Sequence, residues 1–404
     1  MVKMDVSRGE YERRSQTLKE RMAKGQIDAL HLSNPNRIFY LTGCPYIMLT
    51  GMARPFGLVF TADGSKTLIL PTIEVQQVLK DKPFGVDEIV TYWEYPGVPH
   101  VYETIVDVFR KNHLLDKRVG IDGSVLPDVV GVTDPPIQKY LPDVKFIPSK
   151  MLIDEMRITK SAEEIELIKE AAKWSNLAHT YLQEFTQPGV SEIEISSKAT
   201  HEATTVMLKT LGPNYMTKAL RWYTAWARFK AGVRTSFPHG LLVNRKVQIG
   251  DNIETAASAT VGGYSNHLER TMFMGEPSEK QKKYFDIMLR AQDAAIEACK
   301  PGVKCSEVYK AAINIFKGAG LDVDRVVQHR VGHGMGLDEC EPPTFVDGND
   351  EPLRVGMVFT VEPGIYIDGF AGFRHCDTII VTEEGCEDAD YYPRDIESLT
   401  IRNR

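Results

Sequence analysis

The sequence predicts a two-domain α+β protein, with a small α/β domain over residues 1–155 and a larger domain over residues 156–404. Three observations support this expectation. Strand-like and helix-like patterns alternate in the first part of the chain. Ser161 and Glu164 have the spacing of a capping box and open a long helix, which marks a new unit. The rest of the chain contains two similar halves, each with a helix pair followed by strands.

The small domain is predicted from its periodicity and turn signals. Apolar residues at helical spacing indicate helices, and alternation at period two indicates strands. Gly25 ends the first helix, Asp63-Gly64 is typical of a hairpin turn, and the turn-rich NPNR sequence ends the first strand. In chain order, the predicted elements are a helix over 11–25, a strand over 27–33, a hairpin over 56–70, a helix over 100–114 and a strand over 118–124.

The larger domain repeats one plan. One helix runs into Pro188–Val190 and a second helix follows it. Another helix, capped by Ser278, runs into Pro301–Val303 and is again followed by a helix. Strands are predicted within 241–275 and within 355–384. Such duplicated halves predict a pseudo-symmetric domain with its functional site between the halves.

Composition excludes several classes of partner. The net charge of −7 provides no basic footprint, so nucleic acid is not an expected partner. No apolar run is long enough for a membrane helix, and the first residues lack the apolar core of a signal peptide. We therefore expect a cytoplasmic protein that acts on a small molecule. The six cysteines are scattered without a CxxC pair, so neither a disulfide scaffold nor a zinc ribbon is indicated.

Polar clusters gather in the strand-rich parts of the larger domain. Glycine on both sides of His333 brings the backbone close, which favours a functional role over a packing role. Arg270 is expected to be structural. The candidate site residues are His239 in FPHG, His267 and Glu269 in GYSNHLERT, His333 in GHGMG, Glu362 in VEPGIY and Cys376 in FRHCDT.

The order of these motifs, ERT, GHGMGL with EPP, EPGIY and FRHCDTIIVTEEG, resembles the pita-bread family of metallopeptidases and their relatives. That family includes prolidases, Xaa-Pro aminopeptidases, methionine aminopeptidases and creatinase. Residues 1–150 also resemble the creatinase-type N-terminal domain. The resemblance implies a pita-bread catalytic domain behind a smaller N-terminal α/β domain.

The same resemblance locates the metal ligands of the peptidase members. Those members hold two metal ions with two aspartates, a histidine and two glutamates. The matching positions here are Ala256, His267, His333, Glu362 and Cys376. Two dications need bridging carboxylate oxygens, and alanine supplies none. An aminopeptidase with the usual two-metal centre is therefore not expected.

The resemblance to creatinase, a metal-independent branch, gives the leading expectation. It implies His239 as general acid and base, Glu269 and Glu362 as the carboxylates that hold a cationic substrate, and Arg54 as the residue that binds a substrate carboxylate. Arg54 would reach the partner's site in a homodimer. His333 would be the hydrogen-bond partner of His239 or a second proton carrier. We therefore expect a hydrolase without cofactor that cleaves a C–N bond of a guanidino or amidino compound, with creatine hydrolysis to sarcosine and urea as the named reaction.

The chemistry of the residues supports that expectation. Two carboxylates that face one pocket repel each other unless a cation lies between them, and a histidine near neutral pKa can carry the proton. Two positions depart from creatinase: His267 replaces a small residue and Cys376 replaces a histidine. No arginine stands near Thr344 to complete the carboxylate clamp. We expect His267 and Cys376 to contact the substrate and to alter its identity.

Two other functions stay open. His267, His333, Glu362 and Cys376 offer the nitrogen, oxygen and sulfur ligands of a single metal ion, as in a mononuclear Xaa-Pro peptidase-like enzyme. Alternatively, the loss of ligands is typical of a binding protein that has lost catalysis.

Overall fold

The computed structural model describes residues 4–44, 54–93, 100–123, 137–216, 218 and 224–402. The chain forms two compact units, and the N-terminal unit ends at Arg157 while the C-terminal unit continues from Ile158. The predicted boundary was 155–156. Within the described residues, no helix is long and apolar enough to span a membrane.

The N-terminal unit is built around a mixed sheet in the order β4-β3-β2-β1-β5-β6. The predicted hairpin is present, with β2 and β3 antiparallel, and β1 pairs with β5 in parallel. Its elements are α1 (Arg8–Gly25), β1 (Ala29–Leu32), α2 (Pro35–Thr42), β2 (Gly57–Thr61), β3 (Lys66–Pro71), α4 (Val75–Asp81), β4 (Glu88–Tyr92), α5 (Val101–Lys111), β5 (Arg118–Ile121), β6 (Lys145–Pro148) and α6 (Met151–Ile158).

The NPNR segment differs from its prediction as a turn, because it begins helix α2. The Asn34 side chain accepts a hydrogen bond from the backbone N–H of Arg37 at 3.1 Å, and Pro35 occupies the first turn. Asparagine at the N-cap followed by proline satisfies the first turn of a helix as well as it satisfies a β-turn. The buried Ile38 and Phe39 then stabilise the helix against the rest of the unit.

His31 on β1 gives the N-terminal unit a predicted dependence on pH. Its ring is buried, and burial lowers its pKa to about 4 although Asp122 acts to raise it. In the unfolded chain the pKa is about 6.5, so the unfolded state binds more protons below that pH and stability falls as the pH decreases. We expect His31 to cost roughly 2 kcal/mol at pH 5 relative to pH 7.5.

Urea unfolding of wild-type protein and His31→Leu at pH 7.5 and pH 5 measures this effect. The variant is expected to lose less stability on acidification. The exposed His201→Ala on helix α8 (Glu192–Leu211) is the control and is expected to behave like wild type. Equal acid sensitivity in wild type and His31→Leu would contradict the prediction.

The C-terminal unit contains the two halves that the sequence predicts. One sheet has the order β18-β10-β8-β7, with β9 paired to β8, and another has the order β12-β11-β13-β16-β17; β14 and β15 form a hairpin. The elements are α7 (Ala162–Phe185), α8, β7 (Ala225–Ala231), β8 (Asn252–Val261), β9 (Tyr264–Ser265), β10 (Thr271–Met274), α9 (Glu279–Ala298), α10 (Cys305–Gly318), α11 (Val323–Val326), β11 (Gly332–Gly334), β12 (Glu341–Phe345), β13 (Val358–Val361), β14 (Gly364–Ile367), β15 (Ala371–Arg374), β16 (Asp377–Val381), β17 (Cys386–Asp388) and β18 (Thr400–Ile401).

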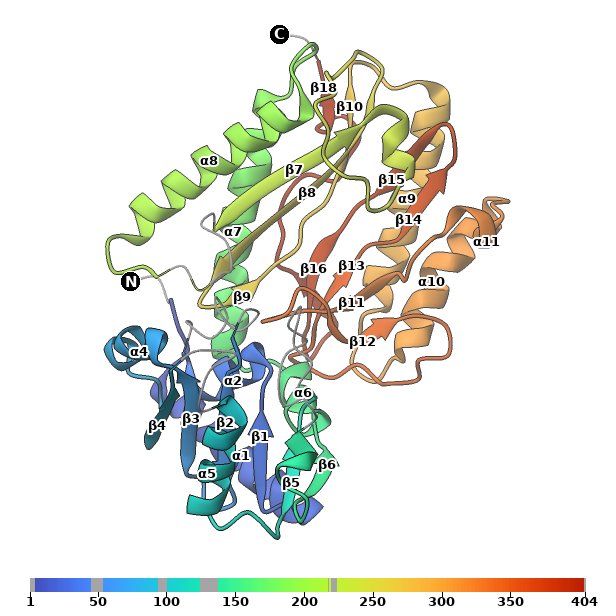
Figure 1. Cartoon of the computed structure of the whole chain (residues 1–404). Helices are drawn as coiled ribbons and strands as arrows, with labels where there is room; N and C mark the ends of the chain where they lie inside the picture. The colour runs from blue at the N-terminus through green and yellow to red at the C-terminus, as the bar shows by residue number, and fades with distance from the viewer. Residues whose placement is uncertain are drawn as a thin grey trace. The chain divides into compact units, whose positions relative to one another are not determined.

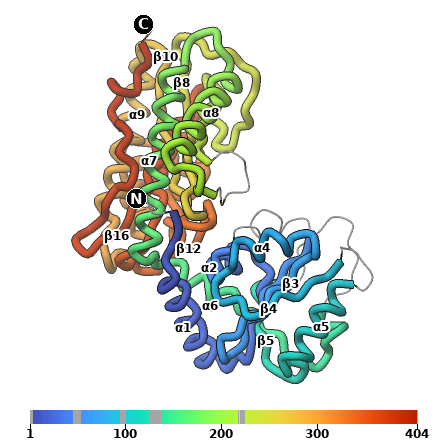
Figure 2. Tube along the Cα trace, turned by 90° about the vertical axis from the view of Figure 1, so that its left-hand side faces the viewer, coloured from blue at the N-terminus to red at the C-terminus, as the bar shows by residue number. Residues whose placement is uncertain are grey.

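Helices cover the sheets of this unit in pairs. Helices α7 and α8 pack on β7 and β8, while α9 packs on α10 and on β13 to β15 (Figure 1). Figure 2 shows α7 and α9 running along the length of the unit. Helix α7 starts with the predicted capping box, in which Ser161 and Glu164 satisfy each other's backbone N–H groups. The two strand systems meet at the residues described next.

Candidate active site

The tight β8–β9 turn positions His267 and Glu269. Gly262 and Gly263 both have positive φ, 57° and 86°, which a two-residue hairpin turn requires and glycine adopts without strain. After the turn, the backbone of Glu269 exchanges two hydrogen bonds with that of Cys376, each 3.0 Å long. The chain therefore joins the two halves of the unit at the candidate site.

His333 lies on β11 with its ring orientation determined by the backbone. A side chain at Gly332 would lie 2.1 Å from the Thr360 carbonyl, so the predicted close approach is present. The Nδ1 atom of His333 lies 2.9 Å from the Gly334 carbonyl oxygen, which accepts only, so Nδ1 carries the proton. The lone pair of Nε2 then faces Glu362 Oε1 at 3.4 Å.

Three predicted residues form one group of potential metal ligands. Each of His267, His333 and Glu362 contributes one donor atom, and these atoms all lie within 4.8 Å of one another. Burial lowers the pKa of His333 to about 4 and raises the pKa of Glu362. His333 is therefore neutral at physiological pH, as a metal ligand must be.

His267 is oriented by a carboxylate. Its Nε2 atom lies 3.3 Å from Glu269 Oε1, while its buried Nδ1 atom has no hydrogen-bond partner among the described residues. Burial would lower the pKa of His267, yet Glu269 raises it to about 9. A carboxylate on one side of an imidazole is the usual arrangement behind a metal-binding histidine, and binding of an ion would displace the second ring proton of His267.

Glu269 is also bound by an arginine that the sequence did not assign to a role. Arg374 forms a two-pronged ion pair with it, with distances of 2.6 Å from Nη2 and 2.5 Å from Nε. Burial alone would raise the pKa of Glu269, but Arg374 and His267 lower it far below its usual range. Glu269 is thus neutralised within the protein, and it does not form a free carboxylate pair with Glu362 for a cationic substrate. This corrects the expected binding mode.

The buried charges continue behind Arg374. Arg374 Nη2 lies 3.2 Å from Glu254 Oε1, which lies 2.9 Å from Lys230 Nζ. Glu254 stands two residues before Ala256 on β8, and Arg374 two residues before Cys376, so alternation at period two was the signal that could have identified both. The alternating signs of these charges compensate their burial.

Lys230 links this network to the loop that carries His239. Its ammonium donates to the carbonyl oxygens of Phe237 and Pro238, the second at 2.8 Å. His239 follows directly, is exposed, and lines the same cavity as His267 and His333. The structure therefore brings His239 to the site, and its role in proton transfer stays a prediction.

Cys376 and Arg54 are not members of the three-residue group. Cys376 is buried, and its Sγ atom lies 3.7 Å from the His267 carbonyl oxygen; its close ligand neighbours are Glu269 and Glu362 rather than the two histidines. Burial raises the pKa of its thiol well above the usual value, so it stays protonated. Arg54 belongs to the N-terminal unit, where its charge opposes the burial that raises the pKa of Glu74. Its contact across a dimer stays a prediction.

The cavity at the site has a volume of about 500 Å³. That volume is typical of small-molecule sites. The two histidines and Glu362 form part of its wall. Further lining residues that the sequence did not single out are Arg228, Lys230, Glu254, His329, Arg330, Glu339 and Arg374.

The donor set fits one metal ion rather than two. Ala256 lines the cavity at the position of the first aspartate and has no ligand atom, so the bridged pair of the peptidases cannot form. Two histidines and a glutamate are a known catalytic zinc set that leaves a position open for water. The buried, unpartnered Nδ1 of His267 and the lone pair that His333 aims at Glu362 support such a site.

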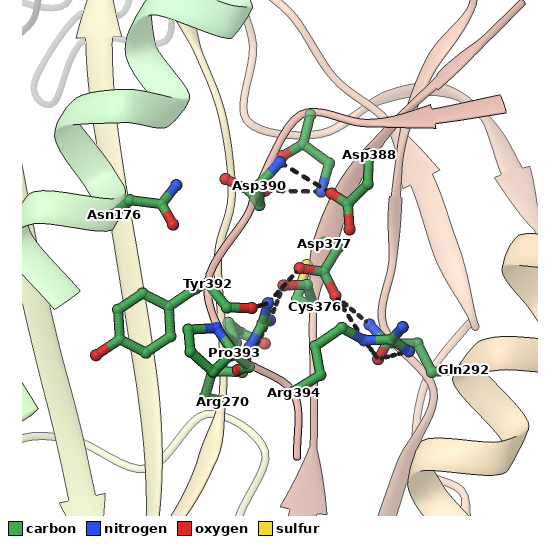
Figure 3. Close-up of polar contacts among 12 residues, drawn as sticks. Asn176, Arg270, Gln292, Cys376, Asp377, Asp388, Asp390, Tyr392, Pro393 and Arg394 are labelled. Atoms are coloured by element: carbon green, nitrogen blue, oxygen red, sulfur yellow. Dashed lines mark hydrogen bonds and ion pairs between the residues drawn. The ribbon is translucent and has the colours of Figure 1, made fainter. Parts of the chain in front are cut away.

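Arg270 forms a structural centre next to the site (Figure 3). Its side chain is fully buried and donates to the carbonyl oxygens of Glu269, Cys376, Tyr392 and Pro393 and to Asp377 Oδ1, the last at 2.6 Å. Five bonds match its five N–H donors. Arg270 is therefore structural, as expected, and its ion-pair partner is Asp377.

Comparisons with known proteins agree on the family. The family model described as "Metallopeptidase family M24" matches residues 166–383. The model described as "Creatinase/Prolidase N-terminal domain" matches residues 14–159. The chain is 29% identical to a Xaa-Pro dipeptidase of Pyrococcus horikoshii over 91% of this chain and 93% of the relative. It is 31% identical to an uncharacterized peptidase of Staphylococcus haemolyticus over 91% of this chain and 96% of that relative.

Solved structures give the same result. The prolidase from Pyrococcus horikoshii superposes with a TM-score of 0.76 at 26% identity, over 95% of this chain and 99% of that one. A Xaa-Pro dipeptidase from Bacillus anthracis has a TM-score of 0.78 at 26% identity, over 96% of this chain and 99% of that one.

These relatives overturn the leading functional expectation. The metal-independent creatinase-like amidinohydrolase is wrong, because this chain matches a metallopeptidase family and its similar proteins include Xaa-Pro dipeptidases and a prolidase. The physical reason is that Glu269 forms ion pairs with Arg374 and His267. Its carboxylate is therefore not available to bind a guanidino substrate. The chain is a hydrolase of the two-domain pita-bread fold and belongs to metallopeptidase family M24.

Proposed function

We propose that this protein is a single-metal peptidase that hydrolyses a short peptide of the Xaa-Pro type. The observation that carries the proposal is the group formed by His267, His333 and Glu362, with donor atoms within 4.8 Å of one another. The names of its relatives, Xaa-Pro dipeptidase and prolidase, support the substrate class.

The residues around the ion have distinct tasks. A bound divalent ion would polarise the scissile carbonyl and lower the pKa of a water molecule. Glu269 orients His267, and the Gly334 carbonyl orients His333. Both contacts fix the orientation of the imidazole ring, which would otherwise vary as the side chain rotates.

Proton transfer can be assigned to two side chains. Glu362 is buried beside His333, and a carboxylate that would hold the ion through one oxygen keeps a second oxygen that can accept a proton from water. His239 lines the cavity and can deliver a proton to the leaving nitrogen, which proline carries as a secondary amine after cleavage. Lys230 maintains the backbone that presents His239.

Metal analysis combined with peptide hydrolysis tests the proposal. We expect about one equivalent of a divalent transition metal per chain. Hydrolysis of Xaa-Pro dipeptides is expected to stop in chelator and to return when zinc, manganese or cobalt is added.

Three results would contradict it. Two metal equivalents per chain would show that a second ion binds without the carboxylate that Ala256 lacks. Undiminished hydrolysis in chelator would remove the metal from the reaction. Metal binding without hydrolysis of any dipeptide would indicate the third possibility, a small-molecule-binding member that has lost catalysis.

A further inference from the structure

Arg330 is a cation in the cavity wall that lacks an acidic partner. It lies between α11 and β11, half-buried, and lines the cavity with Glu362 and His333. Within the described part of the chain, no carboxylate forms an ion pair with it. Its Nη2 atom donates to Cys340 Sγ at 3.1 Å, and its buried Nε atom has no hydrogen-bond partner among those residues.

The buried cations of the same wall are already paired. Arg374 binds Glu269 and Glu254, and Lys230 binds Glu254. The remaining guanidinium, Arg228, is exposed on β7 beside the ring of Trp226. Arg330 thus combines partial burial with unsatisfied donors, and a thiol is only a weak acceptor for a charged group. Leaving a shielded guanidinium N–H without an acceptor is unfavourable, so the site is suited to an anion that arrives from outside.

The anion would lie next to the reacting bond. Arg330 lines the same cavity as Glu362 and His333, two of the proposed metal ligands. The cavity that contains all three side chains is about 500 Å³, which accommodates a dipeptide. An anionic group bound there belongs to the residue on one side of the scissile bond and not to a distant part of a long peptide.

We propose that Arg330 binds the free carboxylate of the substrate's C-terminal residue and so makes the protein a dipeptidase. This inference rests on the proposed function and names its substrate class more closely. A guanidinium binds a carboxylate through two parallel hydrogen bonds. The terminal nitrogens of Arg330 carry four N–H donors, of which Cys340 Sγ takes one. The arginine that the sequence lacked near Thr344 is thus replaced from a different segment of the chain.

Binding of L-proline and L-prolinamide to the metal-loaded full chain tests the inference without turnover. The two compounds differ only in the carboxylate. We expect calorimetry to show that wild-type protein binds L-proline about 10- to 100-fold more tightly. Arg330→Met is expected to lose this preference, while Arg228→Met, the control in the same wall, keeps it. Arg330→Gln serves as a second variant if the methionine variant does not fold.

Two outcomes would overturn the inference. Equal affinity of wild-type protein for the two compounds would show that the carboxylate is not recognised. A preference that survives in both Arg330 variants would assign the recognition to another group. If the preference depends on Arg330 but no Xaa-Pro dipeptide is hydrolysed, the peptidase proposal fails and the carboxylate site stands.

Discussion

His333→Ala is expected to remove the bound metal and to lower dipeptide hydrolysis by about 10³-fold or more, which corresponds to about 4 kcal/mol. The imidazole is neutral, its Nδ1 donates to the Gly334 carbonyl oxygen, and its Nε2 lone pair faces Glu362, another residue of the ligand group. Alanine leaves two ligands, too few for a stable catalytic site. Metal content by elemental analysis and kcat/KM for a Xaa-Pro dipeptide measure the change.

His329→Gln is the matched control for this prediction. His329 lines the same cavity, yet its Nδ1 atom lies 2.6 Å from the Arg330 carbonyl oxygen and its Nε2 atom 2.8 Å from the Tyr366 hydroxyl. Both nitrogens are therefore occupied, and the variant is expected to retain its metal. A His333→Ala protein with a full equivalent of metal would refute the assignment of this ligand.

Arg270→Met is expected to destabilise the protein by about 3–5 kcal/mol, the largest effect on stability among the variants considered. The substitution leaves Asp377 without its closest cation in a fully buried setting and releases four backbone carbonyl oxygens from their donor. Two of these carbonyls belong to Glu269 and Cys376, which join the strands beneath the site. Urea unfolding monitored by circular dichroism measures the loss.

Arg290→Met on α9 is the control for charge removal alone. Its ion pair with Asp286 is 3.6 Å long, and both side chains are more than half exposed, at 58% and 66%. Exposed pairs contribute about 0–1 kcal/mol, so little change is expected. Arg270→Lys should lie between the two, because lysine keeps the charge but has three donors instead of five. Similar stability of the Arg270 and Arg290 variants would show that the buried network is not stabilising.

Much of the fold could be predicted from local patterns. Three predicted features depend only on neighbouring residues, and the structure contains each of them. They are the capping box at Ser161, the β2–β3 hairpin and the close backbone approach at the glycines around His333. The NPNR segment was assigned wrongly because asparagine and proline begin helices as readily as they form turns. Only the burial of the residues after it distinguishes the two.

The site was predicted in part. His267, His333 and Glu362 could be identified from their motifs, and the structure brings them together. The charge state of Glu269 could not be identified in this way, because it depends on Arg374, which approaches from a distant strand. Treating Glu269 as a free carboxylate led to the creatinase-like hypothesis.

By itself, the sequence determined the two domains, the duplicated halves and the positions where the usual metal ligands are missing, since these follow from residue type, spacing and motif order. The tertiary structure decided which groups meet. It paired Glu269 with Arg374, grouped the Cys376 thiol with Glu269 and Glu362 rather than with the two histidines, and placed Arg330 in the cavity wall. Charges interact through space over a few ångströms, so their partners are set by how strands from the two halves come together and not by their separation along the chain.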